Sequence, residues 1–464
     1  MSKFKIKLPV IHYKLESAEL LQAVLMIAVG FSAVPVLMET LGLSYGAAIT
    51  AVALAEALGL LHVLFGDPVV PGWIASALPL VLVYLGRYTV GIESIHALIA
   101  LQLLVSLVFI VLGATGLAHR MMKLVPGSLK AGILLGAAIA AISRVFGEGG
   151  YLYRYPLSVG AGSFTALFFL FSVGFKKAKE SKRIFREIGK YGMLPSLLVA
   201  MAVGFISGEV ELPNIQWGFI PFSFGELFKT ASPLSIGFPS MKMFLAALPT
   251  ALAVYIIAFG EIVTAEAVLK DCSSVRTDEK LDYNSNKSNV IAGVRNLILS
   301  LFAPFTPLAG PLWAAVTVSI GERYKEGKES MKSIFGGLGS FKLSTAVCVL
   351  LLPLASLLEP ILPVALASTL VVQGFACSYI AVEQVKNDRT AAGIAGITGA
   401  IVHLVSLNWA LVIGILSFLF LEGGTGKLLG RKKSAADNRL LEDKKATGYK
   451  KTSKKPVRVF NYKH

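Results

Sequence analysis

Long apolar stretches, each close to the length that crosses a lipid bilayer, recur along this chain and are separated by short polar segments. Since a spanning helix needs about 20 mainly apolar residues, we expect an all-α polytopic membrane protein with 14 transmembrane segments. The expected segments cover approximately residues 18–40, 45–65, 72–85, 94–116, 121–143, 158–175, 191–208, 242–268, 288–303, 310–320, 341–358, 360–384, 390–406 and 408–422.

The third and tenth segments are short, and each begins at a Pro-x-Trp motif. Residues 71–73 read Pro-Gly-Trp and residues 311–313 read Pro-Leu-Trp. Irregular backbone at membrane depth is tolerated where it lines a cavity, so the motifs predict two half-helices, each preceded by a short extended segment. The alternative is a pair of ordinary helix starts, with Pro in the first turn and Trp in an interfacial belt.

The two halves of the chain also match in the first helix of each. Residues 28–34 read AVGFSAV and residues 258–264 read AFGEIVT. Seven segments followed by seven must be inverted in the membrane, because seven is odd. The pattern therefore predicts two inverted seven-span repeats, an architecture that places the binding site at the bilayer midplane between broken helices.

Composition and charge agree with a membrane protein. The chain is 55% hydrophobic and 16% charged, and its formal net charge is +16. Of its 44 Lys and Arg residues, 37 fall in the arm, the tail and the loops on the side that also holds both termini, and five on the other side. The positive-inside rule then makes both termini cytoplasmic, in the cell or cytoplasmic membrane. The charge is explained by topology, so we expect no nucleic-acid partner, and the basic tail is expected to contact lipid headgroups.

Enzyme chemistry finds little support in the sequence. Three cysteines show no framework spacing, and no metal-binding, P-loop or Ser-His-Asp pattern is present. We therefore expect no catalytic residue, metal or cofactor, and no cleavable signal peptide, because the first residues are polar for too long before an apolar run begins.

Glu261 is the strongest candidate for function, because it lies in a long apolar stretch. A carboxylate at that depth costs about 2.5–3.5 kcal/mol on insertion scales and seldom occurs without a partner or a task. We expect Glu261 to contact substrate and to bind the coupling ion. The alternative is a structural carboxylate, capped by backbone or paired with Arg295.

Four other polar side chains lie in apolar segments. Glu56 and Arg295 occupy equivalent second helices of the two halves, and we expect them to form an ion pair, with Arg295 as the alternative source of positive charge for an anion. His62 is either a proton relay or a hydrogen-bonded core residue. Ser32, in the first segment, is a candidate hydrogen-bond donor to substrate.

The starts of the two half-helices are the remaining candidate substrate-binding groups. Their unpaired N–H groups and positive dipole ends favour an anion or the carbonyl edge of a planar base. Two aromatic rings there could enclose a flat ring from both faces, or wedge two parts of the protein together. The residues concerned are Gly72, Trp73, Ser76, Trp313, Ala314 and Ala315.

Four stretches, in order, resemble the uracil–xanthine (nucleobase–ascorbate) permease family and its fold relatives, the sulfate permeases. They are GDPVVPGWIASALPLVLVYLG (66–86), VPGSLKAGILLGAAIAA (125–141), FGEIVTAEAVLKD (259–271) and FAPFTPLAGPLWAAVTVSIGERYKEG (302–327). The family's usual acidic or polar residue in span ten falls near Trp313, and residues 302–321 hold no acid.

The resemblance implies a core domain that moves against a gate domain. Carried onto this chain, the core is 18–116 and 242–358 and the gate is 117–208 and 359–422, with a cytoplasmic arm (1–17) and a basic cytoplasmic tail (423–464). It implies a homodimer and a secondary transporter that works by alternating access. The expected activity is proton- or sodium-coupled symport of a nucleobase-like small molecule. The alternative is a sulfate-permease-like carrier or channel for a small anion.

Overall fold

The computed structural model describes residues 6–182, 184, 185, 188 and 193–422. The tail 423–464, for which lipid contact is expected, lies outside the described residues. In the first half the helices are α1 Ser17–Phe31, α2 Ala33–Leu41, α3 Tyr45–Leu64, the 3-10 helix η1 Ala75–Ala77, α4 Leu78–Leu85, α5 Ile92–Thr115, α6 Ala118–Leu124, α7 Gly127–Phe146, α8 Tyr151–Arg154, α9 Pro156–Phe171, α10 Val173–Ser181 and α12 Leu194–Ser207.

A connection with two short helices leads to the second half. Its helices are α13 Phe224–Ala231, α14 Pro233–Ile236, α15 Met241–Val275, α16 Ser285–Phe302, α17 Ala314–Lys325, α18 Ile334–Cys348, α19 Leu352–Leu358, the 3-10 helix η2 Glu359–Ile361, α20 Leu362–Val385, α21 Arg389–Leu404 and α22 Leu407–Leu421. Elements other than helices are limited, in the described part of the chain, to isolated bridges.

Six helices of the described residues are long and apolar enough to cross a membrane, and seven if the bent pair α9 and α10 is one span. Four shorter apolar helices add to these, including Ala75–Leu85 and Ile334–Cys348. The helical polytopic class is therefore confirmed. The count of 14 spans and their inverted arrangement stay predictions.

Most expected segments coincide with observed helices within a few residues, but some boundaries differ by six or seven. The segment expected at 121–143 is α7, Gly127–Phe146, and the segment expected at 242–268 continues to Val275 in α15. The segment expected at 341–358 begins at Ile334 and breaks after Cys348, so Lys342 lies in the middle of α18 and not near its start.

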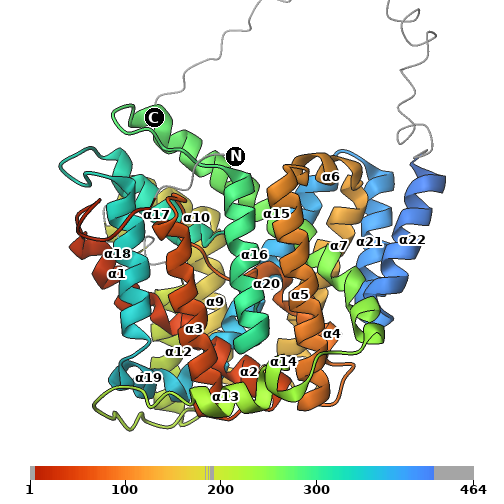
Figure 1. Cartoon of the computed structure of the whole chain (residues 1–464), viewed down its shortest axis with the longest axis horizontal. Helices are drawn as coiled ribbons and strands as arrows, with labels where there is room; N and C mark the ends of the chain where they lie inside the picture. Colours follow the sequence, from red (N-terminus) through yellow and green to blue (C-terminus); the bar gives the residue numbers. More distant parts are fainter. Residues whose placement is uncertain (1–5, 183, 186–187, 189–192, 423–464) are drawn as a thin grey trace, which may run out of the picture.

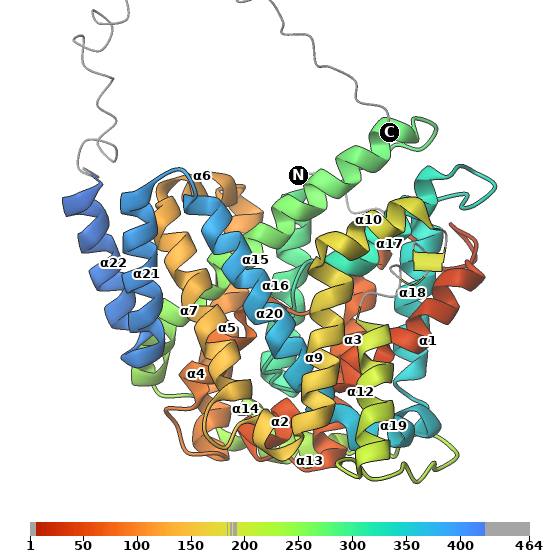
Figure 2. The ribbon, with the colours of Figure 1, turned by 180° about the vertical axis from the view of Figure 1, so that it is seen from behind.

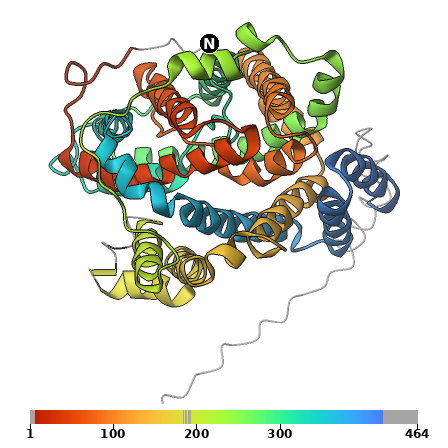
Figure 3. The same ribbon diagram turned by 90° about the horizontal axis from the view of Figure 1, so that it is seen from below.

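The helices pack as two groups. In the first, α5 packs against α15 and α16, and α18 packs against α1 and α3. In the second, α7 packs against α20 and α21, and α9 against α12 and α20. Figure 1 shows the first group in front, Figure 2 shows the second group from behind, and Figure 3 shows both along the bundle. The expected division into a core and a gate stays a prediction.

Small residues allow close packing inside the second group. A methyl group added at Gly136 of α7 would lie 2.5 Å from Val402 of α21. The two backbones can approach because Gly136 has no side chain, as is common where helices pack inside membranes.

The two ends of the bundle differ in charge. Helices α6 and α10, which carry Arg120, Lys123 and three lysines, lie at one end together with the end of α15 (Figure 1). Helices α13, α14 and α19 lie at the other end. We call these the basic end and the opposite end.

Candidate functional site

Two extended segments cross each other in the middle of the first group. The Ile74 N–H donates to Leu308 O at 3.1 Å, the Gly310 N–H to Gly72 O at 2.9 Å and the Trp313 N–H to Val70 O at 2.6 Å. Trp73 and Ala309 form an antiparallel bridge. Prolines in both segments prevent helix, and each pairing replaces hydrogen bonds that a helix would have made. The two short extended segments expected before the half-helices are thus present, and they pair with each other.

The half-helices begin slightly later than expected. The first starts with η1 at Ala75 and continues as α4, and the second starts at Ala314 with Trp313 as its N-cap residue. Gly72, Trp73, Ser76 and Trp313 are half-buried. Ala314 and Ala315 are exposed, so the first N–H groups of α17 face open space.

The crossing leaves no room for a side chain at Gly310. A Cβ built there would lie 2.6 Å from the carbonyl carbon of Trp73. Leu308, two residues earlier, is fully buried and has φ 57°, a left-handed conformation that is uncommon for leucine. Such strain persists where the surroundings over-determine it, often at functional sites.

We therefore expect Gly310→Ala to separate the two segments and to lower the unfolding free energy by about 1–3 kcal/mol, the usual cost of overpacking. Thermal unfolding of the purified protein measures this. Gly127→Ala is the matched control, because a Cβ at the first residue of α7 meets no atom within 4 Å. Equal melting temperatures for the two variants would contradict the close approach.

Arg295 and Asn296 of α16 hold the crossing from behind. Arg295 Nη1 donates to Gly310 O at 2.8 Å and Nη2 to Gly72 O at 3.4 Å, so one guanidinium joins both segments. Asn296 Oδ1 accepts from the Ala309 N–H at 3.0 Å and its Nδ2 donates to Ala309 O at 2.8 Å. Arg295 is only 3% exposed. It therefore acts on the backbone here.

The expected ion pair between Glu56 and Arg295 is wrong. Glu56 Oε2 accepts instead from Lys342 Nζ of α18 at 2.6 Å, and both side chains are buried. Arg295 still lies near enough to Glu56 to interact through charge, but its N–H groups are directed to the carbonyls of the crossing. The long Lys342 side chain reaches Glu56 from a helix whose start the sequence pattern placed seven residues too late.

Glu261 of α15 lies beside the start of α17. Its carboxylate is in hydrogen-bonding contact with the backbone of Leu312, and its Oε2 has no partner among the described residues. Further along, Asp271 of α15 and Lys325 of α17 form an ion pair at 2.7 Å. The two helices thus run side by side in the same direction, and Glu261 lies at the level of the α17 N-terminus.

Helix α15 also contacts η1 and α4, so Glu261's helix touches both half-helices. The Ser76 hydroxyl, at the start of the first, donates to Gln373 Oε1 of α20 at 3.3 Å. The structure therefore gathers the two half-helix starts, α15 and one helix of the second group around one place. Gln373 is a contact that the sequence analysis did not single out, because an uncharged amide in an apolar helix gives little signal.

His62 and Ser32 are core residues in this structure. His62 Nδ1 lies 2.7 Å from Asp67 Oδ2, and both side chains are fully buried. Ser32 is fully buried at the junction of α1 and α2, and its hydroxyl donates to Val29 O at 2.7 Å. A relay role for His62 and a substrate contact for Ser32 stay predictions.

The two tryptophans pack against different phenylalanines. Trp73 meets Phe305 edge to face, with ring centroids 5.9 Å apart, and Trp313 meets Phe341 in the same way at 5.6 Å. Phe305 and Phe341 belong to separate hydrophobic clusters. Each tryptophan thus packs against a different part of the core. A flat substrate bound between the two tryptophan rings stays a prediction.

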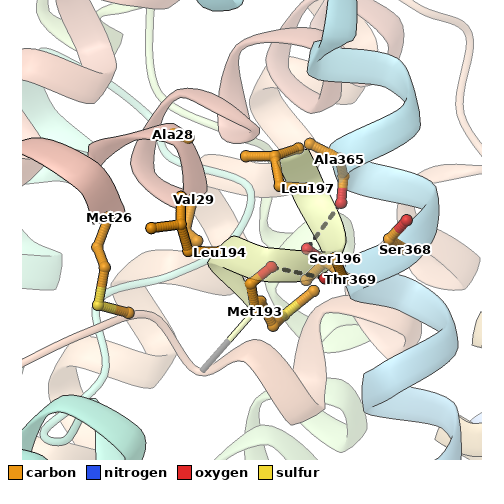
Figure 4. Close-up of a pocket in the computed structure, with 10 residues that line it drawn as sticks. All are labelled: Met26, Ala28, Val29, Met193, Leu194, Ser196, Leu197, Ala365, Ser368 and Thr369. Carbon is orange, nitrogen blue, oxygen red and sulfur yellow. Dashed lines mark hydrogen bonds between the residues drawn. The ribbon is translucent and has the colours of Figure 1, made fainter. Parts of the chain in front are cut away.

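A small cavity of about 20 Å³ lies elsewhere, between α1, α12 and α20 (Figure 4). Two of its hydroxyl groups hydrogen-bond within their own helices, Ser196 to Met193 O and Thr369 to Ala365 O, whereas Ser368 Oγ is buried without a hydrogen-bond partner among the described residues. The cavity has room for about one water molecule. Its lining residues do not include Glu261 or the half-helix starts.

These features define a polytopic helical membrane protein, with broken helices that meet at a half-buried carboxylate. A model described as the Permease family matches residues 19–310. The chain belongs to this family, as the resemblance of its four motifs indicated. Curated proteins gave no match.

Solved structures share the fold, and the following are two of them. One is described as the overall structure of SLC26A9, with 13% identity and a TM-score of 0.55 over 87% of this chain. This chain covers 65% of that protein, which is less than two thirds of its length. The other is murine solute carrier 26 family member A9, an anion transporter in the inward-facing state, with 12% identity and a TM-score of 0.51, over 90% of this chain and 70% of that one.

Proposed function

We propose that this protein is a proton- or sodium-coupled symporter that carries a nucleobase-like heterocycle by alternating access. The observation that carries the proposal is the free Oε2 of Glu261 beside the first N–H groups of α17. A lactam ring such as that of a nucleobase offers an N–H donor next to a C=O acceptor. Its N–H would donate to Glu261, and its C=O would accept from a half-helix start.

The coupling step is assigned to Glu261. A carboxylate in a poorly hydrated site tends to hold a proton, and it releases the proton when water reaches it. A carrier can use this property if the site faces each side of the membrane in turn. Sodium bound at the same carboxylate is the alternative coupling ion.

The moving parts are proposed to be the two helix groups. The core would comprise 18–116 and 242–358, and the gate 117–208 and 359–422, as inverted seven-span repeats with the basic end and both termini in the cytoplasm. Support for this comes from the packing of α5 with α15 and α16, and of α7 with α20 and α21. A homodimer is part of the proposal through the family resemblance alone.

A small anion is the second candidate substrate. It is favoured by two helix N-termini at the site, by the exposed Ala314 and Ala315, and by a fold shared with an anion transporter. Arg295 gives less support for an anion than the sequence analysis indicated, because its guanidinium donates to the carbonyls of Gly310 and Gly72. A carboxylate without a positive partner in direct contact also repels anions, so we rank the heterocycle first.

Thermal unfolding with added ligands distinguishes the two. A ligand at a hundred times its dissociation constant adds about 2.7 kcal/mol to the folded state. We expect uracil or a purine to raise the melting temperature of purified protein. Sulfate, bicarbonate and dicarboxylates are the anion arm. Stabilisation by an anion alone would overturn the heterocycle proposal and favour the second candidate.

A further inference from the structure

Three side chains join the two helix groups at the opposite end of the bundle. Glu39 lies near the end of α2 in the first group, and Arg144 and Tyr151 belong to α7 and α8 of the second. Arg144 Nη2 donates to Glu39 Oε2 at 2.8 Å. The Tyr151 hydroxyl lies 2.9 Å from Oε1 and 2.8 Å from Oε2 of the same carboxylate. We call these three residues the outer latch.

The tyrosine contributes the stronger part of this contact. Arg144 and Glu39 are 45% and 33% exposed at their side chains, and ion pairs at such positions add little. Tyr151 is only 6% exposed.

An apolar seam lies against the latch. Val36 of α2 and Leu78 of α4 are 1% exposed, and they pack in one cluster with Ala141 and Val145 of α7 and with Tyr151. The cluster therefore combines residues of both helix groups. The first half-helix is closed off from this end by apolar contacts that the latch holds in place.

The ion pair between the groups at the basic end is longer and more exposed, and it is accompanied by an edge-to-face contact between His119 and Phe259. His119 Nε2 of α6 lies 3.8 Å from Glu266 Oε2 of α15, and their side chains are 47% and 42% exposed. The face of α15 that continues from Glu261 toward this end is exposed at Val263 and Thr264. Figure 1 shows α6 and α2 at the two opposite ends. The polar contact between the groups at the opposite end is thus shorter and more buried than the ion pair at the basic end.

We propose that Glu39, Arg144 and Tyr151 are positioning residues of the transport cycle, which hold the site closed at the opposite end while it is open at the basic end. The inference rests on the proposed alternating movement of the two groups, but on no particular substrate. Loss of the latch shifts the equilibrium toward the state that opens at the opposite end.

A cysteine placed in the seam reports that shift directly. Val36→Cys is buried in this conformation, and it reacts with a membrane-impermeant maleimide only when the seam opens. In the Val36→Cys background we expect Glu39→Ala to increase the labelling rate by at least about tenfold. The variant loses the hydrogen bonds that the carboxylate accepts from Arg144 and Tyr151, and one charge-assisted hydrogen bond already accounts for a tenfold shift. Tyr151→Phe is expected to give a smaller increase, and it keeps the ring that packs in the seam.

Arg154→Gln is the matched control, because Arg154 is an exposed arginine of the same short helix as Tyr151. It should leave labelling unchanged. The exchanged pair Glu39→Lys with Arg144→Glu should label more slowly than either single change. Gel filtration checks that each variant is folded, and Tyr151→Phe remains informative if Glu39→Ala is not.

Labelling that is unchanged in both Glu39→Ala and Tyr151→Phe would overturn the latch. So would an equal increase in Arg154→Gln, since the effect would then be one of surface charge. The assay needs no substrate, so it can succeed when the heterocycle proposal fails. Conversely, stabilisation by uracil together with unchanged labelling would support the heterocycle proposal and overturn the latch.

Discussion

Glu261→Gln is expected to abolish ion-driven accumulation of substrate while leaving the protein folded. Glutamine has the shape of a protonated glutamate, so it keeps the contacts with α17 but cannot release a proton or hold sodium. Substrate that donates to the carboxylate also loses a charge-assisted hydrogen bond, worth about 1.5–3 kcal/mol. We therefore expect uptake into proteoliposomes under an imposed ion gradient to fall by about 10- to 150-fold.

The control is Glu266→Gln, five residues along the same helix. Its side chain is 42% exposed and lies 3.8 Å from His119, away from the α17 start, so gradient-driven uptake should change little. Exchange of labelled for unlabelled substrate without a gradient is a second readout, and Glu261→Gln should retain part of it. Gradient-driven uptake at the wild-type rate in Glu261→Gln would remove this residue from the coupling step.

The helical membrane class could be predicted from the sequence because a bilayer imposes a strict rule on length and polarity. Apolar runs predicted the long helices to within several residues, and Pro-x-Trp predicted the interruption before each half-helix. The pairing between the two extended segments could not be predicted from the pattern of apolar and polar residues. It depends on a close approach at Gly310, which hydrophobic periodicity does not indicate.

Side-chain partners were harder to predict than helices. Pseudo-symmetry paired Arg295 with Glu56, whose partner is Lys342. Symmetry of position does not fix where a flexible side chain points. The Arg295 guanidinium donates to backbone carbonyls of the extended segments, which have no helical hydrogen-bond partners. The sequence does not indicate which carbonyls these are.

The latch residues show the same limit. Glu39 and Arg144 lie at expected segment ends, where charged residues are ordinary, so nothing in the sequence singles them out. Their role as a contact follows only from the meeting of α2 with α7 and α8. Contacts between the two helix groups are long-range features, and these are the ones that matter for movement.

The buried pair Glu56–Lys342 gives the largest expected change in stability. Each side chain is nearly inaccessible, at 6% and 2% exposure, and the two atoms lie 2.6 Å apart. Removing one partner leaves an uncompensated buried charge, which costs about 3–5 kcal/mol. Glu56→Gln and Lys342→Met should therefore each lower the melting temperature strongly, as measured by thermal unfolding in detergent.

The double variant Glu56→Gln/Lys342→Met should recover most of that loss, because replacing a buried ion pair by groups of similar volume is often close to neutral. A double-mutant cycle then gives a coupling energy of several kcal/mol. Arg295→Met combined with Glu56→Gln is the matched comparison, since Arg295 donates to Gly310 and not to Glu56. Strong coupling in that second cycle and none in the first would restore the pairing that the sequence favoured. The opposite result would establish Lys342 as the partner that keeps Glu56 charged inside the membrane.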